Sequence, residues 1–124
     1  MKKNKIVVID DERDMVQLLR IELETEGYVV SAAFDGKSGL ELIQKVKPDL
    51  VLLDVMMPEM NGYEVLELLK QDPLTKAIPV VMLTAKGLEN EIQKGLDLGA
   101  DEYVSKPFHP GLLIKRIQTL LSRD

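Results

Sequence analysis

Four places along this chain carry polar side chains whose types suit the chemistry of phosphate and metal ions. Two aspartates and a glutamate come first, followed at long intervals by an aspartate, a threonine and a lysine, as Asp10–Glu12, Asp54, Thr84 and Lys106. Oxygen ligands without histidine or cysteine favour a hard cation. A few carboxylates that leave positions for water and phosphate favour Mg²⁺ over Ca²⁺, with Mn²⁺ as an alternative. A carboxylate beside such an ion can attack phosphorus and form an acyl phosphate, while a lysine stabilises charge on the transferred group.

The elements that must position these residues can be recognised from the apolar pattern. Five short apolar runs predict β-strands, namely KIVVI (5–9), YVVSAAF (28–34), LVLL (50–53), VVML (80–83) and Tyr103-Val104. Most of these runs do not alternate apolar and polar residues, which is typical of strands buried on both faces of a parallel sheet. Each of the polar residues above follows one of these runs.

Segments with helical spacing lie between the strands. Met15, Leu19 and Leu23 recur at every fourth position, and Gly27 is a natural helix stop. Further helices are predicted around 40–46 before Lys47-Pro48, 65–69 before Pro73, 88–98 before Gly99, and 110–121 with Pro110 in the first turn. The alternation of strand and helix predicts an α/β fold, with a doubly wound five-stranded parallel sheet, helices on both faces, and one domain over residues 1–124.

The ends of the predicted strands bring the polar residues together. In doubly wound sheets, ligands bind beyond the carboxyl ends of the strands. Taken singly, each residue has a commoner structural role: Asp10 and Asp11 suit a helix start, Asp54 a turn, Thr84 a strand end and Lys106 the solvated surface. Their joint occurrence at the ends of successive strands favours a single site.

Composition excludes several other classes of protein. The net charge is −5 and the pI is about 4.9, which argues against a nucleic-acid-binding surface. There is no cysteine, and His109 is the only histidine, so disulfides and sites built on several histidines are excluded. No apolar run approaches the length of a membrane span, and a cytoplasmic location is expected.

Four segments carry a family resemblance that covers essentially the whole chain. They are VVIDDE (7–12), LVLLDVMMPEMNG (50–62), PVVMLTA (79–85) and ADEYVSKPF (100–108). Together they resemble the receiver domain of two-component response regulators. The resemblance implies a flavodoxin-like sheet with strand order 2-1-3-4-5 and a phosphorylation switch. The phosphoryl donor would be a sensor histidine kinase or a phosphotransfer protein.

The resemblance implies a role for each residue around the metal ion. Asp54 matches the phosphoacceptor, and Asp11 matches the carboxylate that contacts Mg²⁺ directly. Asp10 would act largely through bound water. Met56 would contribute its backbone carbonyl to the metal shell, and Gly62 matches the glycine that closes the loop after the acceptor strand.

The resemblance also implies the parts that sense the phosphoryl group. Thr84 and Ala85 would lie beside it. Lys106 would pair with it, and a cis Lys106-Pro107 peptide bond would direct the lysine side chain into the site. Tyr103 matches the switch residue whose ring turns inward once the Thr84 hydroxyl has moved toward the phosphate. Met56 and Lys86 match positions that set the lifetime of the phosphorylated state, and an apolar Met56 predicts slow self-hydrolysis.

The output surface is expected on the fourth helix, fifth strand and fifth helix. Its partner would be an effector protein or a second copy of the chain. Glu102 and Arg116 suit a charged pair across such a dimer, whereas Ile92 and Leu112 are apolar where a related subgroup places another charged pair. The chain fits both a stand-alone regulator and the front part of a longer one.

Two competing interpretations use similar features. A dehalogenase-type phosphatase also forms an aspartyl phosphate but needs a second aspartate two positions later, where this chain has Met56. A flavodoxin-like cofactor-binding module would need a Gly- or Ser/Thr-rich phosphate loop after the first strand, and Asp10–Glu12 stand there instead. A scaffold that has lost phosphorylation is a third alternative, which the full set of acidic, hydroxyl and lysine residues disfavours.

Overall fold

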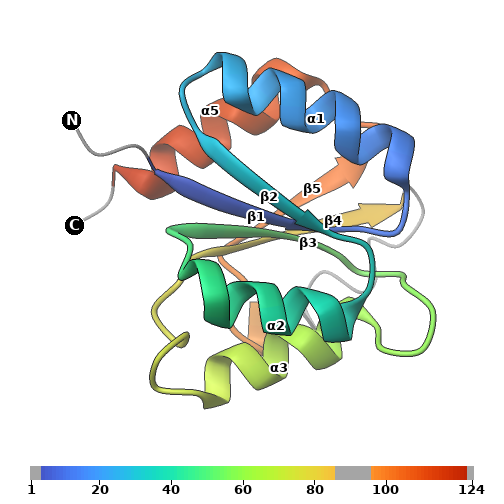
Figure 1. Ribbon diagram of the computed structural model, residues 1–124, viewed down its shortest axis with the longest axis vertical. Coiled ribbons are helices and arrows are strands. Elements are labelled where there is room, and N and C mark those ends of the chain that lie inside the picture. The colour runs from blue at the N-terminus through green and yellow to red at the C-terminus, as the bar shows by residue number, and fades with distance from the viewer. Residues whose placement is uncertain (1–3, 86–95, 123–124) are drawn as a thin grey trace.

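The computed structural model describes residues 4–85 and 96–122. These residues form one parallel sheet with helices on both faces, α1 and α5 on one side and α2 and α3 on the other (Figure 1). The strands are β1 (Lys5–Ile9), β2 (Val29–Ala33), β3 (Leu50–Asp54), β4 (Val80–Ala85) and β5 (Glu102–Lys106). The helices are α1 (Arg13–Thr25), α2 (Gly36–Val46), α3 (Gly62–Gln71) and α5 (Pro110–Leu121). The strand order is β2-β1-β3-β4-β5, so the predicted fold class and order are confirmed.

Two hydrophobic cores lie on the two faces of the sheet. Successive side chains of a strand point to opposite faces. In β1, Ile6 and Val8 therefore pack with α1 and α5, whereas Val7 and Ile9 pack with α2 and α3. All five residues of the central strand β3 are buried. Burial of the strands on both faces of the sheet explains the continuous apolar runs in the sequence.

The helix ends follow local capping chemistry. The Asp35 side chain accepts a hydrogen bond from the Ser38 amide at the start of α2, and Lys47 ends this helix in the left-handed conformation before Pro48. Asn61 and Glu64 form a reciprocal capping box at the start of α3. The predicted stop at Gly27, just after α1, is confirmed by its positive φ of 95°.

Two parts of the chain differ from the sequence-based expectation. The strand predicted at Tyr103-Val104 is longer in the structure. It was underestimated because β5 is an edge strand in which Val104 is the one buried residue, so its apolar pattern is weak. The helix predicted at 88–98 falls mainly on residues 86–95, outside those that the structure describes.

The parallel register gathers the carboxyl ends of the strands at one edge of the sheet. Ile9 lies beside Leu53, and Asp54 beside Leu83. On the next pair of strands, Thr84 lies beside Ser105 and Ala85 beside Lys106. Every predicted site residue on β3, β4 and β5 except Tyr103 therefore lies near this edge. Among the described residues, no helix has the length and apolar character of a membrane span.

Candidate functional site

Three aspartates form an acidic cluster at the carboxyl ends of β1 and β3. Carboxylate oxygens from Asp10, Asp11 and Asp54 all lie within 4.8 Å of one another. Asp10 is fully buried, Asp54 is 4% exposed, and Asp11 is exposed. The Asp10 carboxylate also accepts a hydrogen bond from the Glu12 amide at 3.0 Å, which fixes its orientation just before α1. The first strand and the third strand thus supply the two buried carboxylates.

Lys106 faces this cluster from the end of β5. Its Nζ lies 2.8 Å from Asp10 Oδ2, 3.4 Å from Asp54 Oδ1 and 2.8 Å from Glu12 Oε1. Burial of the ammonium disfavours its charge, but hydrogen bonding and ion pairing with Asp10 and Glu12 outweigh burial and raise the pKa of Lys106. The lysine therefore stays charged throughout the physiological pH range.

The ionised form of Asp54 is disfavoured, first by burial and then by neighbouring negative charge. Burial, and then the charge of Asp10, raise the pKa of Asp54 to about 7. Lys106 and the Met56 amide act in the opposite direction, but they do not restore the ordinary value. One ammonium is insufficient to balance the carboxylates that surround it.

This surplus charge suits a divalent cation. The three aspartates offer only oxygen ligands, the donor type that Mg²⁺ and Mn²⁺ accept. Asp10 and Asp54 are buried where an extra positive charge would relieve their repulsion. The acidic cluster therefore fits the cation predicted from the sequence, and Asp10, Asp11 and Asp54 are the side chains that would hold it.

The loop after β3 shapes the space beside Asp54. The Met56 amide donates a hydrogen bond to Asp54 Oδ1 at 3.3 Å, while the Met56 side chain is 62% exposed. The Gly62 amide donates to the Val55 carbonyl at 2.8 Å. A Cβ atom at Gly62 would overlap the Asp54 carbonyl oxygen, so only glycine allows the loop to close this tightly. The predicted role of the Met56 carbonyl as a metal ligand remains a prediction.

The remaining predicted residues lie at the same edge or behind it. Thr84 is buried at the end of β4, and the Lys106-Pro107 peptide bond is cis, as expected. Tyr103 is half-buried and donates a hydrogen bond from its hydroxyl to that of Tyr63 on α3 at 3.4 Å. The part played by Tyr63 was not predicted, because its sequence context shows only an apolar position of a helix.

Glu102 and Arg116 form an ion pair within the chain. Arg116 Nη1 of α5 lies 2.9 Å from Glu102 Oε2 of β5. Their sequence positions suit a charged pair between two copies of the chain. In the described structure they join the edge strand to its own neighbouring helix.

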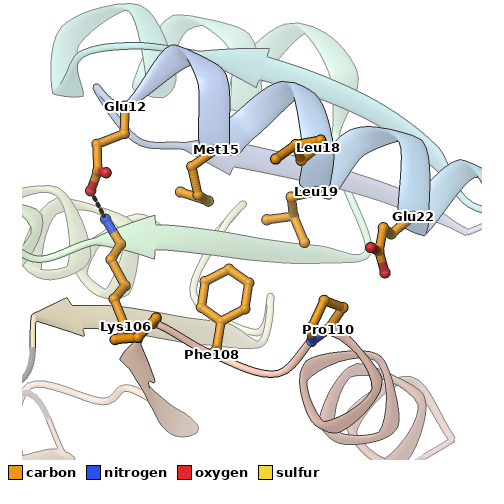
Figure 2. Close-up of a pocket in the computed structure, with 9 residues that line it drawn as sticks. Glu12, Met15, Leu18, Leu19, Glu22, Lys106, Phe108 and Pro110 are labelled. Atoms are coloured by element: carbon orange, nitrogen blue, oxygen red, sulfur yellow. Dashed lines mark hydrogen bonds and ion pairs between the residues drawn. The ribbon is translucent and has the colours of Figure 1, made fainter.

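An apolar pocket opens beside the acidic cluster, between α1 and the connection from β5 to α5. Its volume is about 530 Å³, and Lys106 and Glu12 form one end of it (Figure 2). The lining residues are Glu12, Met15, Leu18, Leu19, Glu22, Lys106, Pro107, Phe108 and Pro110. This pocket could not be predicted from the sequence, because the same helical spacing is typical of side chains that pack into the core.

The fold and the site together define a class of protein. It is a flavodoxin-like α/β domain that carries carboxylates and a lysine at the carboxyl edge of a parallel sheet. The profile of the response regulator receiver domain matches residues 6–118. The chain therefore belongs to the receiver domain family of two-component response regulators, whose general function is to be phosphorylated by a kinase. Both competing interpretations from the sequence, a dehalogenase-type phosphatase and a cofactor-binding flavodoxin, are thereby set aside.

Individual relatives agree with this assignment. The chain is 47% identical to the transcriptional regulatory protein CpxR of Escherichia coli over 121 residues, which cover 98% of this chain and 50% of that protein. It is 45% identical to the alkaline phosphatase synthesis transcriptional regulatory protein PhoP of Bacillus subtilis over 120 residues, which cover 97% of this chain and 49% of that protein. The chain thus spans about half the length of the curated relatives that it matches.

Solved structures show the same fold. A putative response regulator from Chloroflexus aurantiacus is 35% identical, with a TM-score of 0.94 and coverage of 98% of this chain and 100% of that one. The chemotaxis protein CheY4 of Vibrio cholerae is 32% identical, with a TM-score of 0.90 and coverage of 96% and 99%. The fold is therefore shared with a putative response regulator and with a chemotaxis protein.

Proposed function

We propose that this domain accepts a phosphoryl group on Asp54, in a site where Asp10, Asp11 and the Met56 carbonyl help to hold Mg²⁺. The observation that carries this assignment is the convergence of three carboxylates within 4.8 Å, with the Lys106 ammonium 3.4 Å from Asp54. Mn²⁺ would serve as an alternative ion. Asp10 is also buried beside Lys106, so the choice of Asp54 as acceptor rests on its match to the phosphoacceptor position of the receiver family.

The chemistry needs a nucleophile and charge stabilisation. An oxygen of the ionised Asp54 carboxylate attacks phosphorus and forms a new O–P bond. The bond between phosphorus and the donor nitrogen of a phosphohistidine breaks, and its electron pair leaves with the imidazole. A bound Mg²⁺ would supply positive charge for the phosphoryl oxygens. Lys106 supplies further charge and, with its raised pKa, keeps its proton.

The phosphodonor must reach Asp54 past the mouth of the site. We expect a sensor histidine kinase or a phosphotransfer protein to contact the apolar pocket beside Lys106, where Met15, Leu18 and Phe108 offer surface next to the reacting groups (Figure 2). Burial of apolar area would hold the donor in place while the phosphoryl group moves. This pairing follows from the way that response regulators work with histidine kinases.

The response to phosphorylation would travel along β4 and β5. A phosphoryl group adds roughly −1.5 to −2 charge and strong acceptor oxygens. Thr84 and Ala85 at the end of β4 and Lys106 at the end of β5 would turn toward it, and Tyr103 would move behind Thr84. The change would reach an effector protein or a second copy through β5, α5 and the helix predicted at 88–98. The Glu102–Arg116 ion pair lies on this surface and would have to open or be shared in such a dimer.

The domain is proposed as a receiver unit over residues 1–124 in the cytoplasm, with no nucleic-acid contact of its own. CpxR and PhoP, which are about twice its length, are transcriptional regulatory proteins. A stand-alone regulator and a receiver joined to a transcriptional output region both fit the proposed chemistry.

Phosphorylation by a small-molecule donor tests the assignment. Incubation with acetyl phosphate and Mg²⁺, followed by intact mass measurement, should show one phosphoryl adduct. Asp54→Asn should abolish the adduct, whereas Asp14→Asn, on the exposed first turn of α1, should retain it. An adduct that persists in Asp54→Asn would move the acceptor to another residue.

A further inference from the structure

Among the described residues that contact Lys106, Glu12 is the one that the phosphorylation chemistry does not require. It stands at the start of α1, and Figure 2 shows its side chain reaching toward the Lys106 ammonium, which extends from the end of β5. The two atoms Oε1 and Nζ lie 2.8 Å apart, and the Glu12 side chain is 60% exposed. The contact therefore sits at the mouth of the site, between the acidic cluster and the apolar pocket.

Several carboxylates already share the Lys106 ammonium. It has three N–H donors, and three carboxylates surround it, with Asp10 and Glu12 at 2.8 Å and Asp54 at 3.4 Å. A phosphoryl group on Asp54 would take the place of the Asp54 contact and share the ammonium with Asp10 and Glu12, so each of these carboxylates would compete with it. Since Asp10 is fully buried and held by the Glu12 amide, the carboxylate free to turn into water at low cost is that of Glu12.

Charge gives a second argument. Asp10, Glu12 and Asp54 lie around one ammonium, with Asp11 beside two of them, and phosphorylation adds roughly −1.5 to −2 more charge. Glu12 is acidic, but the acidic cluster of Asp10, Asp11 and Asp54 does not include it. Its charge therefore opposes the phosphoryl group and is not offset by direct contact with the cation.

We propose that Glu12 is a positioning residue that competes with the phosphoryl group for the Lys106 ammonium and thereby weakens the phosphorylated state. This inference rests on the proposed function of Asp54. Glu12 holds Lys106 at the mouth of the unphosphorylated acceptor site and turns into water when the acceptor is modified. The effect is a modest adjustment of occupancy, because ion pairs with an exposed partner are weak.

The binding of beryllofluoride, a phosphoryl analogue that attaches to a carboxylate without covalent transfer from a donor, provides the test. With saturating Mg²⁺, Glu12→Gln should bind the analogue about two- to fivefold more tightly than the wild type, the range expected for an ion pair with one exposed partner. The rate of phosphorylation by acetyl phosphate should rise in the same proportion. A purely structural role for Glu12 would instead predict weaker binding and a lower melting temperature.

Two further variants separate the contact from net charge. Glu22→Gln removes the same charge from α1, the helix that Glu12 precedes, at the far end of the pocket from Lys106, and should leave affinity unchanged (Figure 2). In a Lys106→Met background, Glu12→Gln should change the phosphorylation rate no more than Glu22→Gln does. An unchanged or weaker affinity in Glu12→Gln, an equal gain in Glu22→Gln, or a gain that survives Lys106→Met would overturn the proposal. If the wild type bound no analogue at all, the proposed function itself would fail.

Discussion

Two lysines of similar burial lie at opposite ends of the sheet and meet opposite surroundings. The side chain of Lys106 is 15% exposed and faces the carboxylates of Asp10, Glu12 and Asp54. That of Lys70, on α3, is 19% exposed and donates hydrogen bonds to the backbone carbonyls of Lys76 and Ile78, at 3.1 and 3.0 Å. Asp101 is a more distant partner of Lys70, at 3.9 Å.

The two pKa shifts record this difference. Burial lowers the pKa of Lys70, with Asp101 acting in the opposite direction. Burial also disfavours the charge of Lys106, but ion pairing outweighs it and the pKa of Lys106 rises. The Lys70 ammonium donates to two backbone carbonyl groups in the loop between α3 and β4, which is a structural role. At Lys106 the charge is outnumbered by carboxylates, and such an imbalance is what a site for a cation and a phosphoryl group requires.

The largest expected effect separates the two lysines by ligand binding. Lys106→Met should lower the affinity for beryllofluoride about ten- to hundredfold, the loss expected for a hydrogen bond to a charged group. Lys70→Met should leave this affinity unchanged, because Lys70 lies at the other end of the sheet. Titration of each variant at saturating Mg²⁺ measures the difference. A similar loss in both variants would mean that the two lysines do not have distinct roles.

The second prediction reverses the comparison. Lys70→Met should lower the free energy of unfolding by about 1–3 kcal/mol, because two carbonyl groups lose a donor. Urea denaturation measures this change. Lys76→Met is the matched control, since only the backbone carbonyl of Lys76 takes part and its side chain is exposed. Equal stability of Lys70→Met and the control would remove the structural role.

The residues whose positions could be predicted from the sequence differ in a physical respect from those that could not. Asp10, Asp54, Thr84 and Lys106 could be predicted, because strand ends in a parallel sheet meet at one edge regardless of side-chain detail. The contact between Glu12 and Lys106 could not, since it depends on the direction in which a long side chain leaves the first turn of a helix.

Two other features could not be predicted from the sequence either. The contact between the Tyr63 and Tyr103 hydroxyl groups joins α3 to β5 across 40 residues of chain, and neither residue has a local pattern that names its partner. The short prediction for β5 had a similar cause, because an edge strand needs few apolar residues. Strand ends were therefore predictable, and contacts between side chains of separate elements were not.

The third prediction concerns pH in the absence of Mg²⁺. Asp54 has a pKa of about 7 in the folded protein against 3.8 as its ordinary value, so between these values the folded state holds a proton that the unfolded chain releases. The stability of the wild type should therefore fall as pH rises through this window, relative to Asp54→Asn, which does not titrate. Thermal melts from pH 4 to pH 8 measure the difference, and Mg²⁺ should raise the melting temperature of the wild type more than that of the variant. A difference that does not vary with pH would show that burial of Asp54 carries no such penalty.

The smallest expected effect concerns the lifetime of the phosphorylated state. The Met56 side chain is 62% exposed beside Asp54, where a thioether cannot orient an attacking water as an amide can. We therefore expect Met56→Asn to lose its phosphoryl group severalfold faster than the wild type, as followed by intact mass after removal of acetyl phosphate. Leu74→Asn, an equally polar change at an exposed site on the loop between α3 and β4, should decay at the wild-type rate. Equal rates in Met56→Asn and the wild type would show that water reaches the acyl phosphate by a route that this side chain does not control, which would shift attention to the surroundings of Lys106 and Glu12.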